Sequence, residues 1–133
     1  MSLHLIARVT AAVVVSVSVA GFVSADLKGD YKVEFGVQDQ LYTGTAKATP
    51  GAQGAFTAAF NFTSPSNVVA DVTGKTFGDS VTYLAKYADK DRGCTGTFSG
   101  KGKVEKDGSG AAGVVDISDS CSGAITGTFK LSR

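Results

Sequence analysis

The sequence is poor in the residues that most often carry chemistry. It has no tryptophan, and its only histidine, His4, and its only methionine, Met1, lie at the very start of the chain. Without histidine, the rest of the chain cannot build a Ser-His-Asp or Cys-His nucleophile. It also cannot supply histidine ligands to zinc or to non-haem iron. These mechanisms are therefore excluded from the body of the protein.

An excess of charge of one sign is also missing. The chain has 13 Lys and Arg against 12 Asp and Glu, and the two signs are mixed along its length. Binding to phosphate backbones requires clustered Lys and Arg, and binding to a membrane surface favours a basic amphipathic helix. The sequence shows neither pattern, so we expect no nucleic-acid partner, no membrane-surface binding and no cofactor.

The first 25 residues have the pattern of a secretory signal peptide. Arg8 precedes a mostly apolar stretch over residues 9–22, and the small residues of Val23-Ser24-Ala25 suit cleavage after Ala25. The apolar stretch is shorter than the ~20 residues of a spanning helix, so we expect no transmembrane anchor. We predict a signal peptide over 1–25, one domain over 26–133, and a secreted or periplasmic location.

Two cysteines remain after cleavage, Cys94 and Cys121. An even number of cysteines in an exported chain predicts a disulfide, and the alternative is a pair of buried free thiols. Two thiols do not make a tetrathiolate zinc site, and these two lack the Cys-x-x-Cys spacing of a redox site. We therefore predict the disulfide and no metal site.

Short segments of alternating apolar and polar residues fill the mature chain, and Gly, Pro, Asp and Ser separate them at regular intervals. This pattern predicts an all-β sandwich or barrel. The expected strands cover approximately residues 30–35, 40–48, 55–62, 67–73, 80–88, 94–105, 111–117 and 121–131. We predict a single small antiparallel up-and-down barrel, comparable in architecture to lipocalins and streptavidin.

Segment 80–88 also fits a helix, since Val81 and Leu84 begin an apolar stripe at helical spacing. We favour a strand, because Tyr83 and Tyr87 join the apolar face only when residues alternate at period two.

The predicted disulfide restricts the topology. In a simple meander, segment 111–117 lies between the strands that Cys94 and Cys121 open. Strands two apart in a sheet are about 10 Å apart, whereas the Cα atoms of a disulfide lie within about 7 Å. The bond can form only beyond the end of the intervening strand, so the turn at Ser118-Asp119-Ser120 predicts a disulfide at one mouth of the barrel.

Thr-Gly-Thr occurs three times, at residues 43–45, 95–97 and 126–128, and each glycine falls on the inward face. A strand glycine weakens a sheet unless the strand coils tightly or a ring lies over the bare backbone. Small closed barrels use both devices.

The inward aromatic residues have two interpretations, a plain core or the wall of a ligand cavity. They are Tyr31, Phe35, Phe56, Phe60, Phe62, Tyr83, Tyr87, Phe98 and Phe129. An eight-stranded barrel is just wide enough either to fill with side chains or to hold one small molecule. Inward Gly and Ala leave space, and tyrosine hydroxyls would supply polar contacts. The candidate ligand-binding residues are Tyr31, Tyr83, Tyr87, Phe60 and Phe98.

Carboxylates are the remaining candidates for chemistry. Asp89 and Asp91 alternate in a turn, but the third acid and the bidentate Glu of a calcium loop are missing. We expect these acids, and Asp116 and Asp119, to face water. A glycosidase needs two acids on facing walls of a cleft, which the sequence does not show, so no catalytic residues are predicted.

The leading function is an exported, non-enzymatic binding module with a small or apolar ligand in or at the mouth of the barrel. The alternative is an exported surface-interaction protein, an inhibitor or envelope-assembly component acting through its loops. A carboxylate-based hydrolase is the third candidate. The expected partner is a small apolar ligand or a protein, and we expect a monomer.

Overall fold

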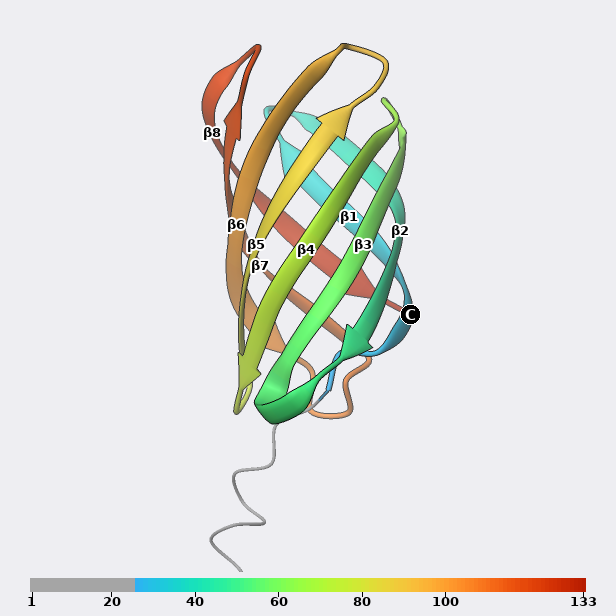
Figure 1. The fold of residues 1–133 in the computed structure, drawn as a ribbon, viewed down its shortest axis with the longest axis vertical. Coiled ribbons are helices and arrows are strands. Elements are labelled where there is room, and N and C mark those ends of the chain that lie inside the picture. The colour runs from blue at the N-terminus through green and yellow to red at the C-terminus, as the bar shows by residue number, and fades with distance from the viewer. Residues whose placement is uncertain (1–25) are drawn as a thin grey trace, which may run out of the picture.

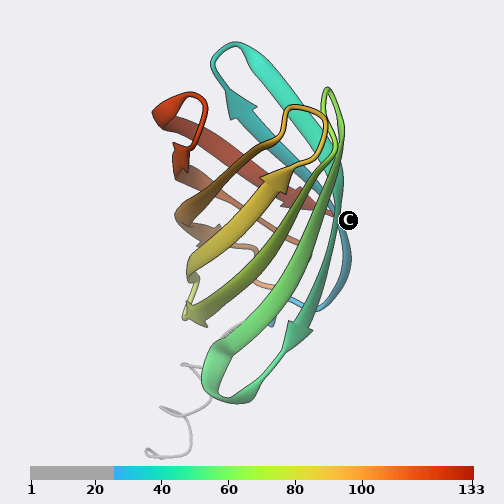
Figure 2. The same cartoon turned by 45° about the horizontal axis from the view of Figure 1, so that its top comes forward.

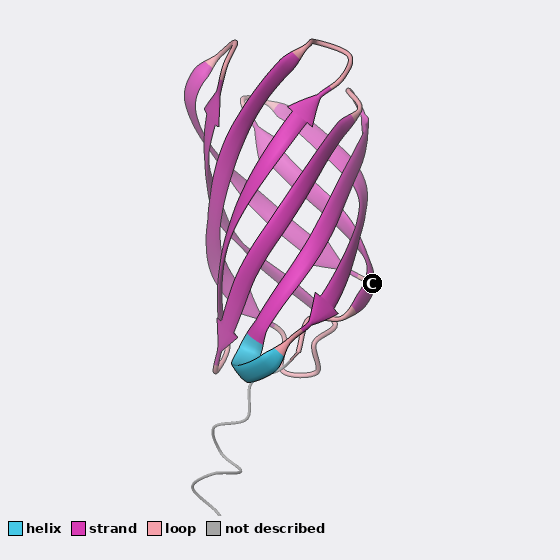
Figure 3. Ribbon diagram, in the orientation of Figure 1, coloured by secondary structure: helices cyan, strands magenta, loops and turns pink. Residues whose placement is uncertain are grey.

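The computed structural model describes residues 26–133, so the predicted signal peptide lies outside the described part of the chain. Within residues 26–133, eight strands form a closed barrel (Figure 1). They are β1 (Gly29–Val37), β2 (Gln40–Pro50), β3 (Ala55–Ser64), β4 (Val68–Phe77), β5 (Ser80–Asp89), β6 (Cys94–Val104), β7 (Gly110–Asp119) and β8 (Gly123–Ser132). A single 3₁₀ turn, η1 (Ala52–Gly54), connects β2 to β3 (Figure 3).

Each strand pairs antiparallel with the next one along the chain, and β8 returns to pair with β1. Val33 of β1 lies opposite Gly44 on one side and Leu131 on the other, so this strand has two paired edges. The β8–β1 pairing closes the sheet over residues 32–37 and 127–132, so these parts of the two strands are not open edges that could template aggregation. The predicted all-β, antiparallel, up-and-down barrel is confirmed.

The ambiguous fifth segment is a strand, as predicted. Tyr83 is buried on its inward face and Tyr87 packs against the core from the same face. Other strands differ from the prediction at their ends: β6 ends at Val104 rather than Glu105, and β8 begins at Gly123, which leaves Cys121 in the preceding turn.

The alternating pattern packs an aromatic core inside the barrel. All nine inward aromatic residues predicted from the sequence are buried in the core or pack against it. The rings meet mainly edge to face, as in the Phe35–Phe98 pair, whose centroids are 5.1 Å apart with planes at 78°. This geometry is favoured by the quadrupoles of the rings.

One explanation for the inward glycines, a ring that lies over the bare backbone, is confirmed at Gly96. A Cβ on Gly96 would lie 2.6 Å from Cζ of the Tyr87 ring, so this ring covers the bare backbone. A Cβ on Gly44 would meet the backbone of the neighbouring strand, 2.5 Å from the Phe62 Cα, beside an irregularity in the β2–β3 register. Gly96 thus makes room for a ring, and Gly44 makes room for the close approach of the β3 backbone.

One end of the barrel is closed by its own side chains. Leu27 and Tyr31 are 2% and 3% exposed there. The Tyr31 hydroxyl donates a hydrogen bond to the Gly108 carbonyl at 2.7 Å, and the Arg133 guanidinium lies 4.4 Å above the Tyr31 ring. The first residues before β1, the β6–β7 loop and the C-terminus are thereby tied together.

The opposite end is ringed by the loops that follow β1, β3, β5 and β7 (Figure 2). No helix within residues 26–133 has the length and apolar character needed to cross a lipid bilayer.

Candidate ligand-binding site at the mouth of the barrel

A cavity of about 70 Å³ opens at this ringed end. Its wall is mostly apolar: aromatic rings come from Phe35, Tyr42, Phe62, Tyr87 and Phe98, and aliphatic groups from Val37, Val68, Ile117 and Ile125. The remaining lining residues are Asp89, Arg92 and Asp119. The site is therefore an apolar cup with charged groups on its wall.

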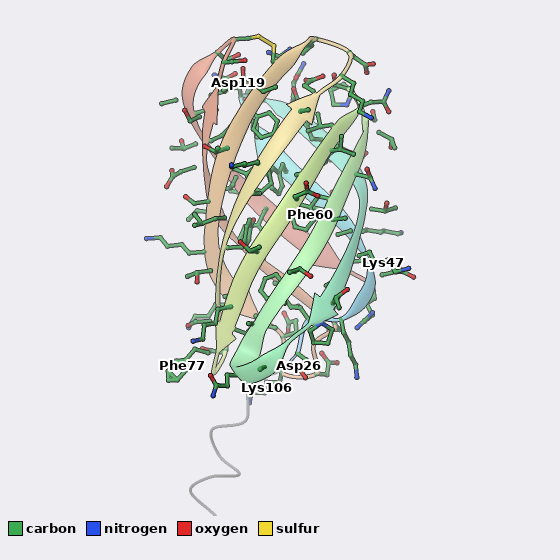
Figure 4. The ribbon with its side chains drawn as sticks, in the orientation of Figure 1. Asp26, Lys47, Phe60, Phe77, Lys106 and Asp119 are labelled. Atoms are coloured by element: carbon green, nitrogen blue, oxygen red, sulfur yellow. A yellow bond between two sulfur atoms is a disulfide. The ribbon has the colours of Figure 1, made fainter. Side chains whose placement is uncertain are left out.

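Asp119, at the end of β7, is held by several donors at the mouth (Figure 4). The Tyr87 hydroxyl donates to its Oδ2, and the backbone N–H groups of Cys121 and Ser122 donate to its Oδ1 at 2.8 and 3.0 Å. Burial raises the pKa of this carboxyl, but the Tyr87 and backbone hydrogen bonds outweigh burial and lower it below its ordinary value. Asp119 is therefore a carboxylate at neutral pH.

The same contact acts in the opposite direction on Tyr87. Burial, followed by the hydrogen bond to Asp119, raises the pKa of the Tyr87 hydroxyl above its ordinary value. Tyr87 is therefore a neutral donor at the mouth, with its proton directed to Asp119.

Asp89, at the end of β5, is the second buried carboxylate that lines the cavity. The Ser66 hydroxyl donates to Oδ1 of Asp89 at 2.7 Å, and the Arg92 backbone N–H donates to the same oxygen at 3.2 Å. The Arg92 guanidinium lies between the two acids, 3.4 Å from Asp89 Oδ2 and 3.8 Å from Asp119 Oδ1. The side chains of Asp89 and Asp119 are 3% and 5% exposed, and that of Arg92 is 41% exposed.

The expectation that Asp89 and Asp119 face water was wrong. Both strands continue further than the sequence pattern indicated, so the inward alternation of β5 reaches Asp89 and that of β7 reaches Asp119. Continuing the period-two count by one step would have found both residues. Asp91 and Asp116 are exposed, as expected.

The predicted disulfide between Cys94 and Cys121 is present at this mouth, with the Cα atoms 5.8 Å apart. It connects the start of β6 to the β7–β8 turn, and two hydrogen bonds between Thr95 and Ser120 run beside it. Within residues 26–133, Cys94, Cys121 and Asp119 form one group with the spacing of metal ligands. Because the two sulfurs are bonded to each other, the group offers no thiolates.

The structure brings two of the five predicted ligand-binding residues, Tyr87 and Phe98, to the cavity wall. Phe60 lies about midway along the barrel (Figure 4), where its ring packs against Tyr83 with centroids 6.1 Å apart. Tyr31 lies at the closed end. The predicted set therefore spans the length of the barrel and does not form a single site.

Tyr83 is a special case among them. Its hydroxyl is buried and has no hydrogen-bond partner within the described part of the chain. Burial raises the pKa of this hydroxyl well above its ordinary value. The hydroxyl therefore places a polar atom in the aromatic core without forming a hydrogen bond within residues 26–133.

The fold and the cavity define a closed eight-stranded up-and-down barrel with one plugged end and one open end. Two solved structures are similar to it. One is a redesigned β-barrel with a TM-score of 0.59 and 15% identity, covering 80% of this chain and 90% of that one. The other is the redesigned β-barrel mFAP1 bound to DFHBI, with a TM-score of 0.54 and 15% identity, covering 80% of this chain and 94% of that one.

At this level of identity the likeness concerns the fold alone. No family model matches the chain, and no curated protein matches it.

Proposed function

We propose that this protein is an exported, non-enzymatic binding protein that holds a small, largely apolar ligand in the open mouth of its barrel. The observation that carries the proposal is the asymmetry between the two ends. One end is filled by Leu27 and Tyr31, whereas the other keeps an apolar void whose polar groups lie near the rim. An apolar pocket with a few convergent polar groups is the usual form of a small-molecule site.

The size of the void limits how a ligand would lie. An engineered cavity of about 150 Å³ accommodates benzene, so a void of about 70 Å³ accommodates only part of such a ring. The ligand would insert an apolar end against Phe62 and Phe98 and keep its other end among the loops. Its polar groups would then lie near Tyr87 and Arg92.

The likeness to mFAP1 supports this proposal at the level of the fold, because that barrel is bound to a small molecule, DFHBI. It does not indicate the ligand of this chain.

The non-enzymatic part of the proposal is supported by the state of Asp119. A carboxylate hydrolase needs one acid with a raised pKa, so that it can donate a proton. Asp119 does not provide that acid, because its pKa is lowered and both of its oxygens already accept hydrogen bonds. Asp119 holds the β7–β8 turn through the N–H groups of Cys121 and Ser122.

One observation favours the alternative of a surface-interaction protein. Leu84 and Val114 point outward, are 65% and 47% exposed, and line a shallow groove on the outside of β4–β7. A partner that binds there would leave the mouth untouched.

Two measurements test the proposal. Native mass spectrometry of protein purified without denaturation should detect a small molecule carried with the chain. Indole, as an added probe, should raise the melting temperature. Ile125→Phe places a ring in the mouth and should abolish this effect, whereas Thr126→Phe places the same ring outside and should preserve it. No carried ligand and no response to indole, or an unchanged response in Ile125→Phe, would contradict the proposal.

A further inference from the structure

We propose that the ligand of the mouth is an organic cation, an ammonium group carrying apolar substituents, placed against the aromatic wall and beside Asp89 and Asp119. The inference rests on the proposed function and specifies the chemical class of its ligand. It follows from three features of the cavity: the balance of charge, the position of Arg92 and the aromatic wall.

The lining residues leave one negative charge without a counterion. Two carboxylates, Asp89 and Asp119, face one guanidinium, that of Arg92, and no other charged residue lines the cavity within residues 26–133. Both carboxylates are almost completely buried. A buried charge is unfavourable unless it is paired. A ligand cation would compensate the excess, whereas a ligand anion would double it.

Arg92 does not fully compensate the negative charge of the two carboxylates, Asp89 and Asp119. Strong guanidinium–carboxylate hydrogen bonds are about 2.7–2.9 Å long, but the guanidinium of Arg92 lies 3.4 Å from the Asp89 carboxylate and 3.8 Å from that of Asp119. Its side chain is also partly exposed at the rim. The guanidinium thus contacts both acids at distances longer than those of a strong ion pair, and the excess negative charge of the mouth is left to the ligand.

The aromatic part of the cavity wall is also suited to an ammonium group with apolar substituents. Faces of aromatic rings attract cations, and sites for alkylated ammonium ions are commonly built from several rings. Five aromatic rings line the cavity, and the neighbouring pairs Tyr42–Phe62 and Tyr87–Phe98 among them have centroids 6.4 and 5.9 Å apart. An ammonium with apolar substituents combines apolar surface with positive charge, and the mouth combines apolar surface with negative charge.

The experiment uses three probes of similar shape on the purified protein with its disulfide intact. They are benzyltrimethylammonium, its neutral carbon isostere neopentylbenzene, and the anion phenylmethanesulfonate. We expect the cation to bind about tenfold more tightly than the neutral isostere and the anion to bind most weakly. The preference for the cation should fall as ionic strength rises.

Asp119→Asn keeps the shape of the side chain and should reduce the preference for the cation severalfold, with little effect on the neutral probe. Asp116→Asn is the matched control, because it removes an exposed carboxylate from the same strand. If Asp119→Asn does not fold, the salt dependence of the wild-type protein still decides the question.

The outcomes separate this inference from the proposed function. Equal or tighter binding of the neutral probe or the anion, or a cation preference that is insensitive to salt, would overturn the inference while the mouth remained a binding site. Failure of all three probes to bind would count against both this inference and the proposed function.

Discussion

The ring of Tyr83 lies over the backbone of Gly100, the residue directly opposite it in the neighbouring strand. A Cβ on Gly100 would lie 2.5 Å from Cε2 of this ring. The ring is held on its other sides by Phe60, Phe98 and Phe129, with centroid distances of 6.1, 6.1 and 5.1 Å. The glycine therefore makes room for a ring at the centre of the core.

Replacing this glycine should be costly. Gly100→Ala forces a methyl group into the Tyr83 ring, and we expect the free energy of unfolding to fall by about 1–3 kcal/mol, the usual cost of overpacking. Urea denaturation measures this change. Gly51→Ala is the control, because a Cβ there meets its nearest neighbour at an ordinary 3.4 Å, and it should change stability little. Equal effects of the two substitutions would show that the ring contact is not the reason for the glycine.

The same substitution at two tyrosines should act in opposite directions. Tyr83→Phe removes a buried hydroxyl without a partner in the described structure, and we expect stability to rise by about 1 kcal/mol. Tyr31→Phe removes a hydroxyl that donates to Gly108 and accepts from Arg133 and the Lys28 N–H, and we expect a loss of about 1–3 kcal/mol. Chemical denaturation at pH 7 measures both. A destabilised Tyr83→Phe would indicate that its hydroxyl has a partner.

The sequence predicted the barrel because its signals are local. Alternation along each strand determines which side chains face inward, and the turn residues between Val104 and Gly110 or between Phe77 and Ser80 separate one strand from the next. The position of the disulfide followed from strand spacing together with the turn expected at Ser118-Asp119-Ser120. These features depend on neighbours in the chain and on fixed distances within a sheet.

The depth of a side chain along the barrel depends on its position within its strand and on the direction of that strand, and the predicted ligand residues were chosen by their inward face alone, which is why they were dispersed. Tyr31 is near the start of β1 and lies at the closed end, whereas Tyr87 is near the end of β5 and lies at the mouth. Arg92 and Ser66 reach the site from loops, where no periodic pattern indicates the direction of a side chain. Their contacts with Asp89 depend on how the loops lie next to one another in the folded protein.

The disulfide should contribute substantially to stability. Replacing Cys94 and Cys121 with serine removes a cross-link between residues 27 positions apart, and the chain-entropy model gives a loss of about 3.5 kcal/mol. Denaturation of the double variant measures this loss, and wild-type protein treated with a dithiol reductant should behave in the same way. A loss under about 1 kcal/mol would mean that the loops hold the mouth without the bond.

Asp119 should make stability depend on pH in the acid range. Because its pKa is lowered on folding, its stabilising contribution is fully present above the unfolded pKa of about 3.9 and is lost as pH falls through the lower folded value. The difference in unfolding free energy between wild type and Asp119→Asn should therefore be constant near neutrality and shrink below about pH 4. A constant difference down to pH 2 would contradict the assignment.

The most direct test of a ligand-binding mouth is a methyl NMR titration of the chain from residue 26 with benzyltrimethylammonium and neopentylbenzene. Ile117 and Ile125, the two isoleucines in residues 26–133, both line the cavity, whereas Leu27 lies at the closed end and Leu84 on the outside. We predict that at least one probe shifts the two isoleucine methyl signals and leaves those of Leu27 and Leu84 in place. Shifts confined to Leu84, or no shift with either probe, would contradict the account.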